Sequence, residues 1–91
     1  MPISASAGHF QKNDALVEVR EAPGGGSAVI IESPLRDLFG AQQDHAVGEV
    51  LKELGQTGLI VRVQDNQALD FVLRARVRAA VERFREKRGS R

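Results

Sequence analysis

The spacing of hydrophobic residues along the chain predicts three β-strands and two helices. In ALVEVRE, residues 15–21, Val17 and Val19 alternate with charged residues, and period-two alternation of branched residues is typical of a half-buried strand. SAVIIE, residues 27–32, is interpreted as a second strand. LIVRVQ, residues 59–64, predicts a third strand, with Leu59, Val61 and Val63 on one face.

The glycine-rich segment PGGG, residues 23–26, separates the first two of these strands. Phosphate-binding loops open a helix and continue with Lys and Ser or Thr. This segment is followed by a strand instead, so we interpret it as the turn of a β-hairpin.

A first helix is predicted between the second and third strands. Ser33 and Pro34 are typical of a helix start, and Gly55 is typical of a helix end. A bend or break is expected near Gly40, because glycine weakens a helix interior. We expect the buried stripe of this helix to contain Leu35, Leu38, Phe39, Ala46, Val50 and Leu54.

A second, longer helix is predicted from a cap at Asp65 or Asn66 to about residues 85–88. At 100° per residue, its apolar stripe contains Leu69, Leu73, Val77, Ala80 and Phe84. Two residues break this pattern. Phe71 lies on the opposite face, either as an isolated exposed aromatic or as a docking contact.

Arg76 is the other exception, because it lies at the edge of the same stripe. Either its stem lies on the core while the guanidinium reaches solvent, or the guanidinium binds a carboxylate. The candidate carboxylates for such a tether are Asp65, Glu32 and Glu18.

The element order ββαβα predicts an α+β fold, a two-layer sandwich in which both helices cover one face of a three-stranded, mainly antiparallel sheet. Strand order 2-1-3, all antiparallel, and order 1-2-3 with one parallel pair both fit this arrangement. Residues 1–14 are polar and predict a flexible N-terminal arm. Residues 15–88 form the single domain, and residues 89–91 form a tail.

Composition excludes several classes of function. The 91 residues contain no cysteine, which excludes a disulfide scaffold, a zinc–thiolate site and a cysteine nucleophile. His9 and His45 are the only histidines, and no metal site or acid–base pair is predicted around them. We expect a cytoplasmic protein, because no signal-peptide pattern and no apolar run of about 20 residues is found.

The charge is unevenly distributed along the chain. Residues 74–91 contain eight basic and two acidic residues, whereas residues 1–73 contain five basic and ten acidic ones. The basic end of the last helix could bind nucleic-acid phosphates. However, Glu82 and Glu86 are spaced to pair with neighbouring arginines, and tyrosine and tryptophan are absent. A solvated helix end is therefore the favoured interpretation, and nucleic-acid binding the alternative.

The segment QDNQALDFVLRARVRAA, residues 64–80, resembles the C-terminal signature of the citrate lyase acyl carrier protein family, the gamma subunit. That signature is an Asp-Lys-Gly-Ala-Leu-Asp/Glu-Cys-hydrophobic-hydrophobic-Arg-Ala-Arg run. Phe39-Gly40 and VLKELG, residues 50–55, are also similar to the family. The matching residues of the signature are Asp65, Ala68, Leu69, Asp70, Leu73, Arg74, Ala75 and Arg76. Asn66, Gln67 and Phe71 depart from it, standing in place of Lys, Gly and Cys.

The resemblance extends to AGHFQKND, residues 7–14, which is similar to the family's carrier loop, Ala-Gly-Thr-Leu-Glu-Ser-Ser/Gly-Asp. In the family, the serine of this loop carries a phosphoribosyl-dephospho-coenzyme A group. Gly8 and Asp14 match the loop, whereas Lys12 stands at the attachment position and Asn13 follows it.

The resemblance therefore implies a non-catalytic, acyl-carrier-type subunit that is not loaded at the usual position, and no cofactor is expected. It would act as a docking or structural subunit beside transferase and lyase subunits, with Phe71, Arg74 and Arg76 as partner contacts. The first alternative is a true carrier modified at Ser6 or Ser4, which would bear phosphoribosyl-dephospho-coenzyme A. The second is the nucleic-acid-binding module.

Overall fold

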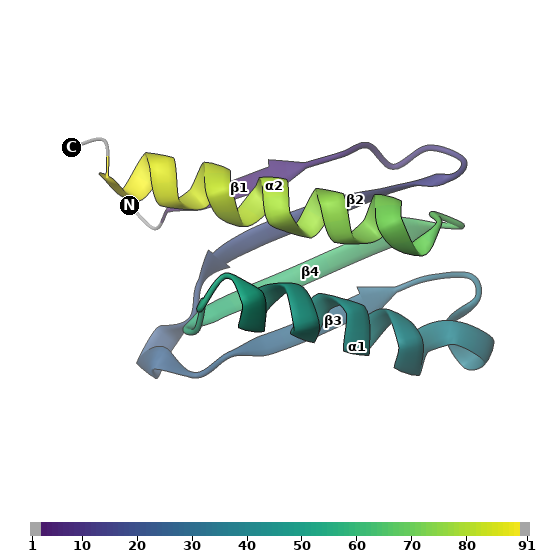
Figure 1. The fold of residues 1–91 in the computed structure, drawn as a ribbon, viewed down its shortest axis with the longest axis horizontal. Coiled ribbons are helices and arrows are strands. Elements are labelled where there is room, and N and C mark those ends of the chain that lie inside the picture. The colour runs from purple at the N-terminus through teal and green to yellow at the C-terminus, as the bar shows by residue number, and fades with distance from the viewer. Residues whose placement is uncertain (1–2, 90–91) are drawn as a thin grey trace.

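A four-stranded sheet forms one layer of the molecule and two helices form the other (Figure 1). This computed structural model describes residues 3–89. The elements in chain order are β1 (Ser4–Ala7), β2 (Asp14–Glu21), a short 3-10 turn (Pro23–Gly25), β3 (Ala28–Glu32), α1 (Arg36–Glu53), β4 (Leu59–Asn66) and α2 (Asp70–Gly89). The two-layer α+β class is as predicted, with four strands in place of three.

The core lies between the sheet and the two helices. Alternate residues of the strands point toward the helices, which is why β2 and β4 show the period-two pattern. The buried apolar residues include Val17, Val19, Val61 and Val63 from the strands, Ala46, Val47 and Val50 from α1, and Leu73, Val77, Ala80 and Phe84 from α2. The expected stripe of α2 from Leu73 to Phe84 is thus confirmed.

The strand order differs from both orders that the sequence suggested. The sheet has the order β1-β2-β4-β3, in which β2 and β4 are antiparallel and β3 and β4 are parallel. β4 therefore separates the two strands that were expected to form a hairpin. β2 and β3, on either side of β4, are about 10 Å apart. The six-residue connection 22–27 spans this distance. β4 takes the central place because Leu59, Val61 and Val63 are buried there.

Residues 4–7 form a strand and not part of a free arm, which corrects the predicted flexible arm over its described residues, 3–14. β1 pairs antiparallel with β2, with Ala5 opposite Val19 and Ala7 opposite Val17. Ala5 and Ala7 are buried, because α2 packs directly over β1 and leaves room only for small side chains. Residues 1 and 2, and residues 90 and 91 of the expected tail, lie outside the described part of the chain.

Helix α1 is continuous through Gly40, so the helix is not broken there. Its apolar stripe is shorter than predicted, because Leu38 and Phe39 are exposed. The start of α1 extends past the end of β3 (Figure 1). The helix ends as expected, with Gly55 in the left-handed conformation at φ 63°.

Helix α2 begins later than predicted, at Asp70. Leu69 lies before its first turn, where its carbonyl accepts the N–H groups of Val72 and Leu73. Because Leu69 is outside the helix, the helical phase does not apply to it, and the residue is 61% exposed instead of buried. Phe71 is 69% exposed, as predicted.

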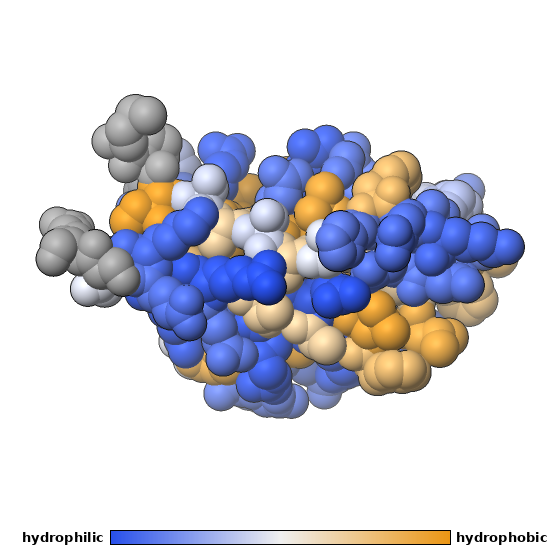
Figure 2. All heavy atoms as spheres, turned by 90° about the horizontal axis from the view of Figure 1, so that it is seen from above, coloured by the Kyte–Doolittle hydropathy of each residue, from blue (hydrophilic) through white to orange (hydrophobic). Residues whose placement is uncertain are grey.

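One end of the molecule carries the β1–β2 loop and the first turns of both helices (Figure 1); we call it the loop end. Seen from above, many of the apolar side chains at the surface lie toward this end, on the right of Figure 2. Within the described residues, neither helix is long and apolar enough to cross a membrane.

Candidate functional site

The β1–β2 loop, residues 8–13, contains the segment that resembles a carrier loop. It starts at Gly8, whose φ of 86° is in the left-handed region that favours glycine. A side chain at this position would also collide with its surroundings. A Cβ atom would lie 2.0 Å from the carbonyl oxygen of Ala15 and 2.9 Å from Cδ of Arg76. Glycine is therefore required by both conformation and space.

A tight turn forms the tip of the loop. The N–H of Asp14 donates to the carbonyl of Gln11 over 3.0 Å, which places Lys12 and Asn13 at the two central positions. Asn13 has φ 65°, a conformation that asparagine tolerates better than most residues. Its N–H donates to the carbonyl of Asn66 at the end of β4, over 2.7 Å. Lys12 therefore lies at an exposed tip whose backbone is held in place.

Asp14 and Arg76 join the loop to α2. Nε and Nη2 of Arg76 donate to the two carboxylate oxygens of Asp14 over 2.9 and 3.0 Å, a bidentate pair. The backbone N–H of Ala15 adds a third bond of 2.7 Å. These bonds hold the pKa of Asp14 below its ordinary value; the Arg76 bond is the largest cause, and burial opposes it. The carboxylate thus remains ionised although Asp14 is only 6% exposed.

The sequence predicted that Arg76 would bind a carboxylate at the edge of the core, but it named the wrong partners. Glu32 and Glu18 both lie near Arg62, at 2.9 and 3.8 Å. Asp65 bonds elsewhere, as described below. The sequence predicted a flexible arm around Asp14, and the local sequence pattern did not indicate a contact between this residue and α2.

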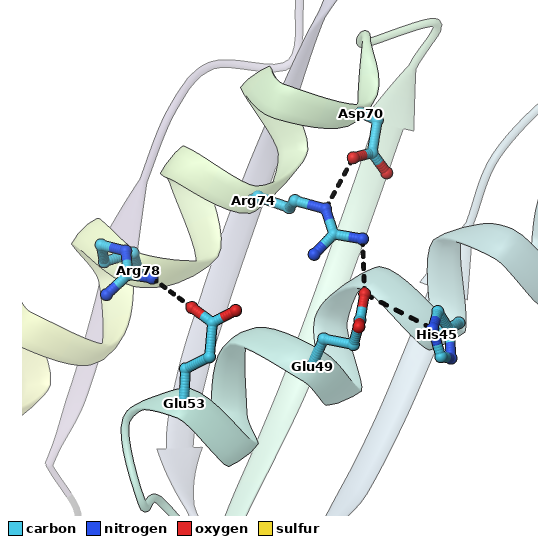
Figure 3. Close-up of polar contacts among 6 residues, drawn as sticks. All are labelled: His45, Glu49, Glu53, Asp70, Arg74 and Arg78. Atoms are coloured by element: carbon cyan, nitrogen blue, oxygen red, sulfur yellow. Dashed lines mark hydrogen bonds and ion pairs between the residues drawn. The ribbon is translucent and has the colours of Figure 1, made fainter.

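A second set of ionic contacts connects the two helices (Figure 3). Nε of Arg74 donates to Asp70 over 2.6 Å, and Nη2 donates to Glu49 over 2.7 Å. His45 lies 3.4 Å from the same Glu49 oxygen. The Arg74 bond, with His45 as the next cause, holds the pKa of Glu49 below its ordinary value. Arg78 and Glu53 form a parallel contact of 2.8 Å.

Asp65 is buried where β4 ends, and the sequence did not predict its environment. Its carboxylate accepts hydrogen bonds from Ser33 Oγ over 2.8 Å and from Gln43 Nε2 over 2.9 Å. The N–H groups of Gln67 and Ala68 also donate to it. These bonds join β4, the start of α1 and the turn before α2. The predicted helix cap at Asp65 or Asn66 is wrong, because α2 begins only at Asp70; Asp65 accepts N–H groups of the turn before the helix instead.

The other candidate residues are distributed over the surface. Ser4 and Ser6 are exposed on β1, and their carbonyl groups accept bonds from Lys87 and Arg83 of α2. Phe71 lies at the loop end, exposed in the first turn of α2. His9 and His45 are not part of any group of three or more His, Cys, Asp or Glu residues that could hold a metal ion within residues 3–89.

The family model described as "ACP: Malonate decarboxylase delta subunit (MdcD)" matches residues 3–84. The chain belongs to this acyl carrier family.

Curated members of the family are similar over most of their length. The chain is 48% identical to the citrate lyase acyl carrier protein of Pectobacterium atrosepticum, over 85% of this chain and 79% of the relative. It is 39% identical to that of Fusobacterium nucleatum, over 88% and 85%. It is 40% identical to that of Klebsiella pneumoniae, over 91% and 86%. Because acyl carrier proteins are non-catalytic carrier subunits, we assign this chain to the same class.

Proposed function

We propose that the chain is an acyl-carrier-type subunit that docks in a lyase-like complex without a prosthetic group at the usual loop position. The observation that carries this proposal is the placement of Lys12. It lies at the exposed tip of the β1–β2 loop, at the position where the resembling motif has its attachment serine.

The chemistry of attachment supports an unloaded loop. A phosphodiester link to the prosthetic group requires a side-chain oxygen as nucleophile. Lys12 presents an ammonium group and Asn13 a carboxamide, and neither can form this bond. The residues at the loop tip therefore do not fit phosphoribosyl-dephospho-coenzyme A.

The framework of the loop supports a retained docking role. Gly8, Asp14 and Arg76 keep the loop in a defined shape although the nucleophile is replaced. We infer that this shape is kept because transferase and lyase subunits contact the loop end. Phe71 is the exposed aromatic candidate for this contact. Arg74 and Arg76, which bind carboxylates within the chain, are the two other candidate contacts.

A carrier modified at Ser6 or Ser4 is the first alternative. Both side chains are exposed and have the required oxygen. However, both residues are part of β1, paired with Glu18 and Arg20, and not of the loop tip. An attachment enzyme that recognises the tip would have to act on a strand instead, which is why we favour the unloaded subunit.

Nucleic-acid binding by α2 is the second alternative. Several basic groups of this helix have acceptors within the chain: Arg74 and Arg78 bind Glu49 and Glu53, and Arg83 binds the Ser6 carbonyl. Phosphates would compete with these contacts, so the arrangement favours a protein-binding role. Steeply salt-dependent binding to RNA or DNA would support the alternative.

Reconstitution with the citrate lyase subunits of Pectobacterium atrosepticum tests the proposal. Carrier-free transferase and lyase subunits are mixed with this chain or with the relative's own loaded carrier. We expect this chain to co-elute with the subunits in size-exclusion chromatography but to restore no lyase activity. Restored activity would show a loaded carrier, and failure to co-elute while the relative's carrier does so would exclude the docking role.

A further inference from the structure

β3 is an edge strand with little protection against further pairing. Among the described residues, β4 is its one neighbour in the sheet, and an edge strand presents a row of unpaired N–H and C=O groups. Edge strands often carry lysine or proline, which prevent the addition of another strand. β3 (Ala28–Glu32) contains neither, and Ile30 is 46% exposed on the face of the sheet that the helices do not cover. This edge can therefore accept another strand.

A hollow of about 300 Å³ lies beside this edge, between β3 and α1. The strand lines it with Val29 and Ile31, and the helix lines it with Arg36, Gly40, Ala41 and Asp44. Gly40 leaves space for the side chain of Arg36, since a Cβ atom at Gly40 would lie 3.1 Å from Cγ of Arg36. Arg36 passes over this glycine and donates from Nη1 to the Ile31 carbonyl over 3.1 Å. The middle of the hollow thus carries only small side chains on the helix side, which lets a second backbone come close.

The two charged residues of the hollow have opposite sign and lie at equal distances from Gly40. Arg36 is four positions before it and Asp44 four positions after it, which is about 6 Å along the helix in each direction. Within residues 3–89, the carboxylate of Asp44 makes no hydrogen bond or ion pair, and Arg36 uses one of its five N–H donors. A two-fold axis at Gly40 would place Arg36 of one copy opposite Asp44 of the other, and the reverse.

The strand is self-complementary about the same axis. Gly40 lies level with the middle of β3, because Val29 and Ile31 line the hollow together with it. Antiparallel pairing centred on Ile30 places Val29 of one copy opposite Ile31 of the other, and Ala28 opposite Glu32. No two like charges of the strands then face each other, which would be destabilising. The strand and the helix flank therefore call for the same symmetry.

We propose that two copies of this chain associate through this edge. β3 pairs antiparallel with β3 of the second copy, and the two α1 helices form two ion pairs between Arg36 and Asp44. The interface is isologous and closes, because the same surface serves both copies. A second copy is the occupant since it presents both an unpaired edge strand and a base and an acid at the matching spacing. Asp37, the neighbouring acid of α1, is not part of the hollow's lining.

This inference goes beyond the proposed function and does not depend on it. A two-fold axis across the sheet edge reverses the direction of the second copy, so the two loop ends point away from each other. Both β1–β2 loops then remain accessible to other subunits.

Sedimentation velocity of the full chain over a concentration series tests the interface. We expect a dimer whose dissociation constant rises about 10-fold or more in Arg36→Asp and in Asp44→Arg, because each variant places like charges opposite each other. The double variant, with both substitutions, should restore the dimer, since the axis brings the exchanged charges together again. Glu82→Arg is the control, because α2 packs over β1 and β2 and not over β3; it should dimerise like the unaltered chain.

A cross-link tests the strand register independently. The chain contains no cysteine, so Ile30→Cys introduces a single thiol. Residues directly opposite in an antiparallel pair have Cα atoms about 4.5–5.5 Å apart, which suits a disulfide. Oxidised glutathione should join two chains by converting their thiols to a disulfide, while it is reduced to glutathione. Leu38→Cys, an exposed position of α1 outside the hollow, should give the mixed disulfide with glutathione instead. Intact mass distinguishes the two products.

The results decide the proposal in either direction. A chain that stays monomeric at every concentration, together with no covalent dimer of Ile30→Cys, would overturn it. A dimer that neither single charge variant weakens would also overturn it, because the copies would then meet through another surface. Thermal unfolding checks that each variant is folded, and if a charge variant is not, the cross-link decides. None of these results changes the proposed docking role, which is measured with other subunits.

Discussion

Arg76 holds the carboxylate of Asp14 with two hydrogen bonds of 2.9 and 3.0 Å, across 62 positions of the sequence. The pair connects the start of β2, directly after the β1–β2 loop, to the middle of α2. Because Gly8 leaves the space through which the arginine passes, the three residues act as one unit that fixes the loop. The stability of the loop should therefore depend on each of them.

Removing Arg76 should destabilise the protein. Arg76→Met leaves a buried carboxylate with one remaining bond, from the Ala15 N–H, and we expect a loss of about 1–3 kcal/mol of unfolding free energy. Urea denaturation of Arg76→Met, Asp14→Asn and the double variant measures the coupling of the pair. Additive losses would mean that the two side chains do not stabilise the fold through each other.

The contribution of this pair should depend on pH. The pKa of Asp14 is lowered in the folded state from an ordinary value of 3.8. Its contribution is therefore fully present above the ordinary value and is lost as pH falls toward the lower, folded value. The difference in unfolding free energy between the unaltered chain and Arg76→Met should be constant near pH 7 and should shrink below about pH 4. A difference that stays unchanged into strong acid would contradict the assignment.

Gly8 and Gly24 have similar backbone angles, so alanine substitutions at these two positions distinguish the cost of backbone strain from the cost of a steric collision. Gly8 and Gly24 have φ of 86° and 78°, but only at Gly8 would an added Cβ atom collide with its neighbours; at Gly24 no atom lies within 4 Å of that position. Gly24→Ala should cost about 1 kcal/mol through its backbone conformation. Gly8→Ala should cost about 3 kcal/mol or more, because the Ala15 carbonyl has to move as well. Equal losses in thermal or urea unfolding would show that the close approach is unimportant.

Phe71 and Phe84 should respond differently to truncation, although both belong to α2. Phe84 is 1% exposed, so Phe84→Ala should cost about 3–5 kcal/mol. Phe71 is largely exposed, so Phe71→Ala should leave the melting temperature nearly unchanged while weakening subunit association. A large fall in melting temperature for Phe71→Ala would show that the residue serves the fold.

The elements in which hydrophobic residues recur at a regular spacing were predictable from the sequence. β2, β4 and the α2 stripe from Leu73 to Phe84 follow from alternation or helical spacing of branched and aromatic residues. β1 was missed because serine and alanine have little β propensity. The strand forms because its alanines fit beneath α2, and that fit depends on an element that comes more than 60 positions later.

The candidate site was only partly predictable for the same reason. The sequence placed Lys12 at the attachment position and Arg76 at the edge of the core. It did not pair Arg76 with Asp14, because local spacing contains no information on contacts between distant segments. The order of the strands was also inaccessible, since any connection of six residues can form a hairpin or span one intervening strand.

We propose that the loop has a defined shape but lacks an attachment oxygen at its tip. The direct test of this central claim is intact mass spectrometry after incubation with the family's attachment enzyme and its prosthetic-group precursor. Three proteins are compared: the unaltered chain, Lys12→Ser, and a variant with Thr-Leu-Glu-Ser at positions 9–12.

We predict no mass increase for the unaltered chain, partial modification of Lys12→Ser, and more complete modification of the fully restored loop. Lys12→Ser should be modified in part, because Gly8 and Asp14 match the carrier-loop motif. The restored loop should be modified more completely, because His9, Phe10 and Gln11 differ from that motif. No modification of the restored loop would contradict the resemblance of this segment to a carrier loop. Modification of the unaltered chain, mapped to Ser4 or Ser6, would contradict the central claim and identify a loaded carrier.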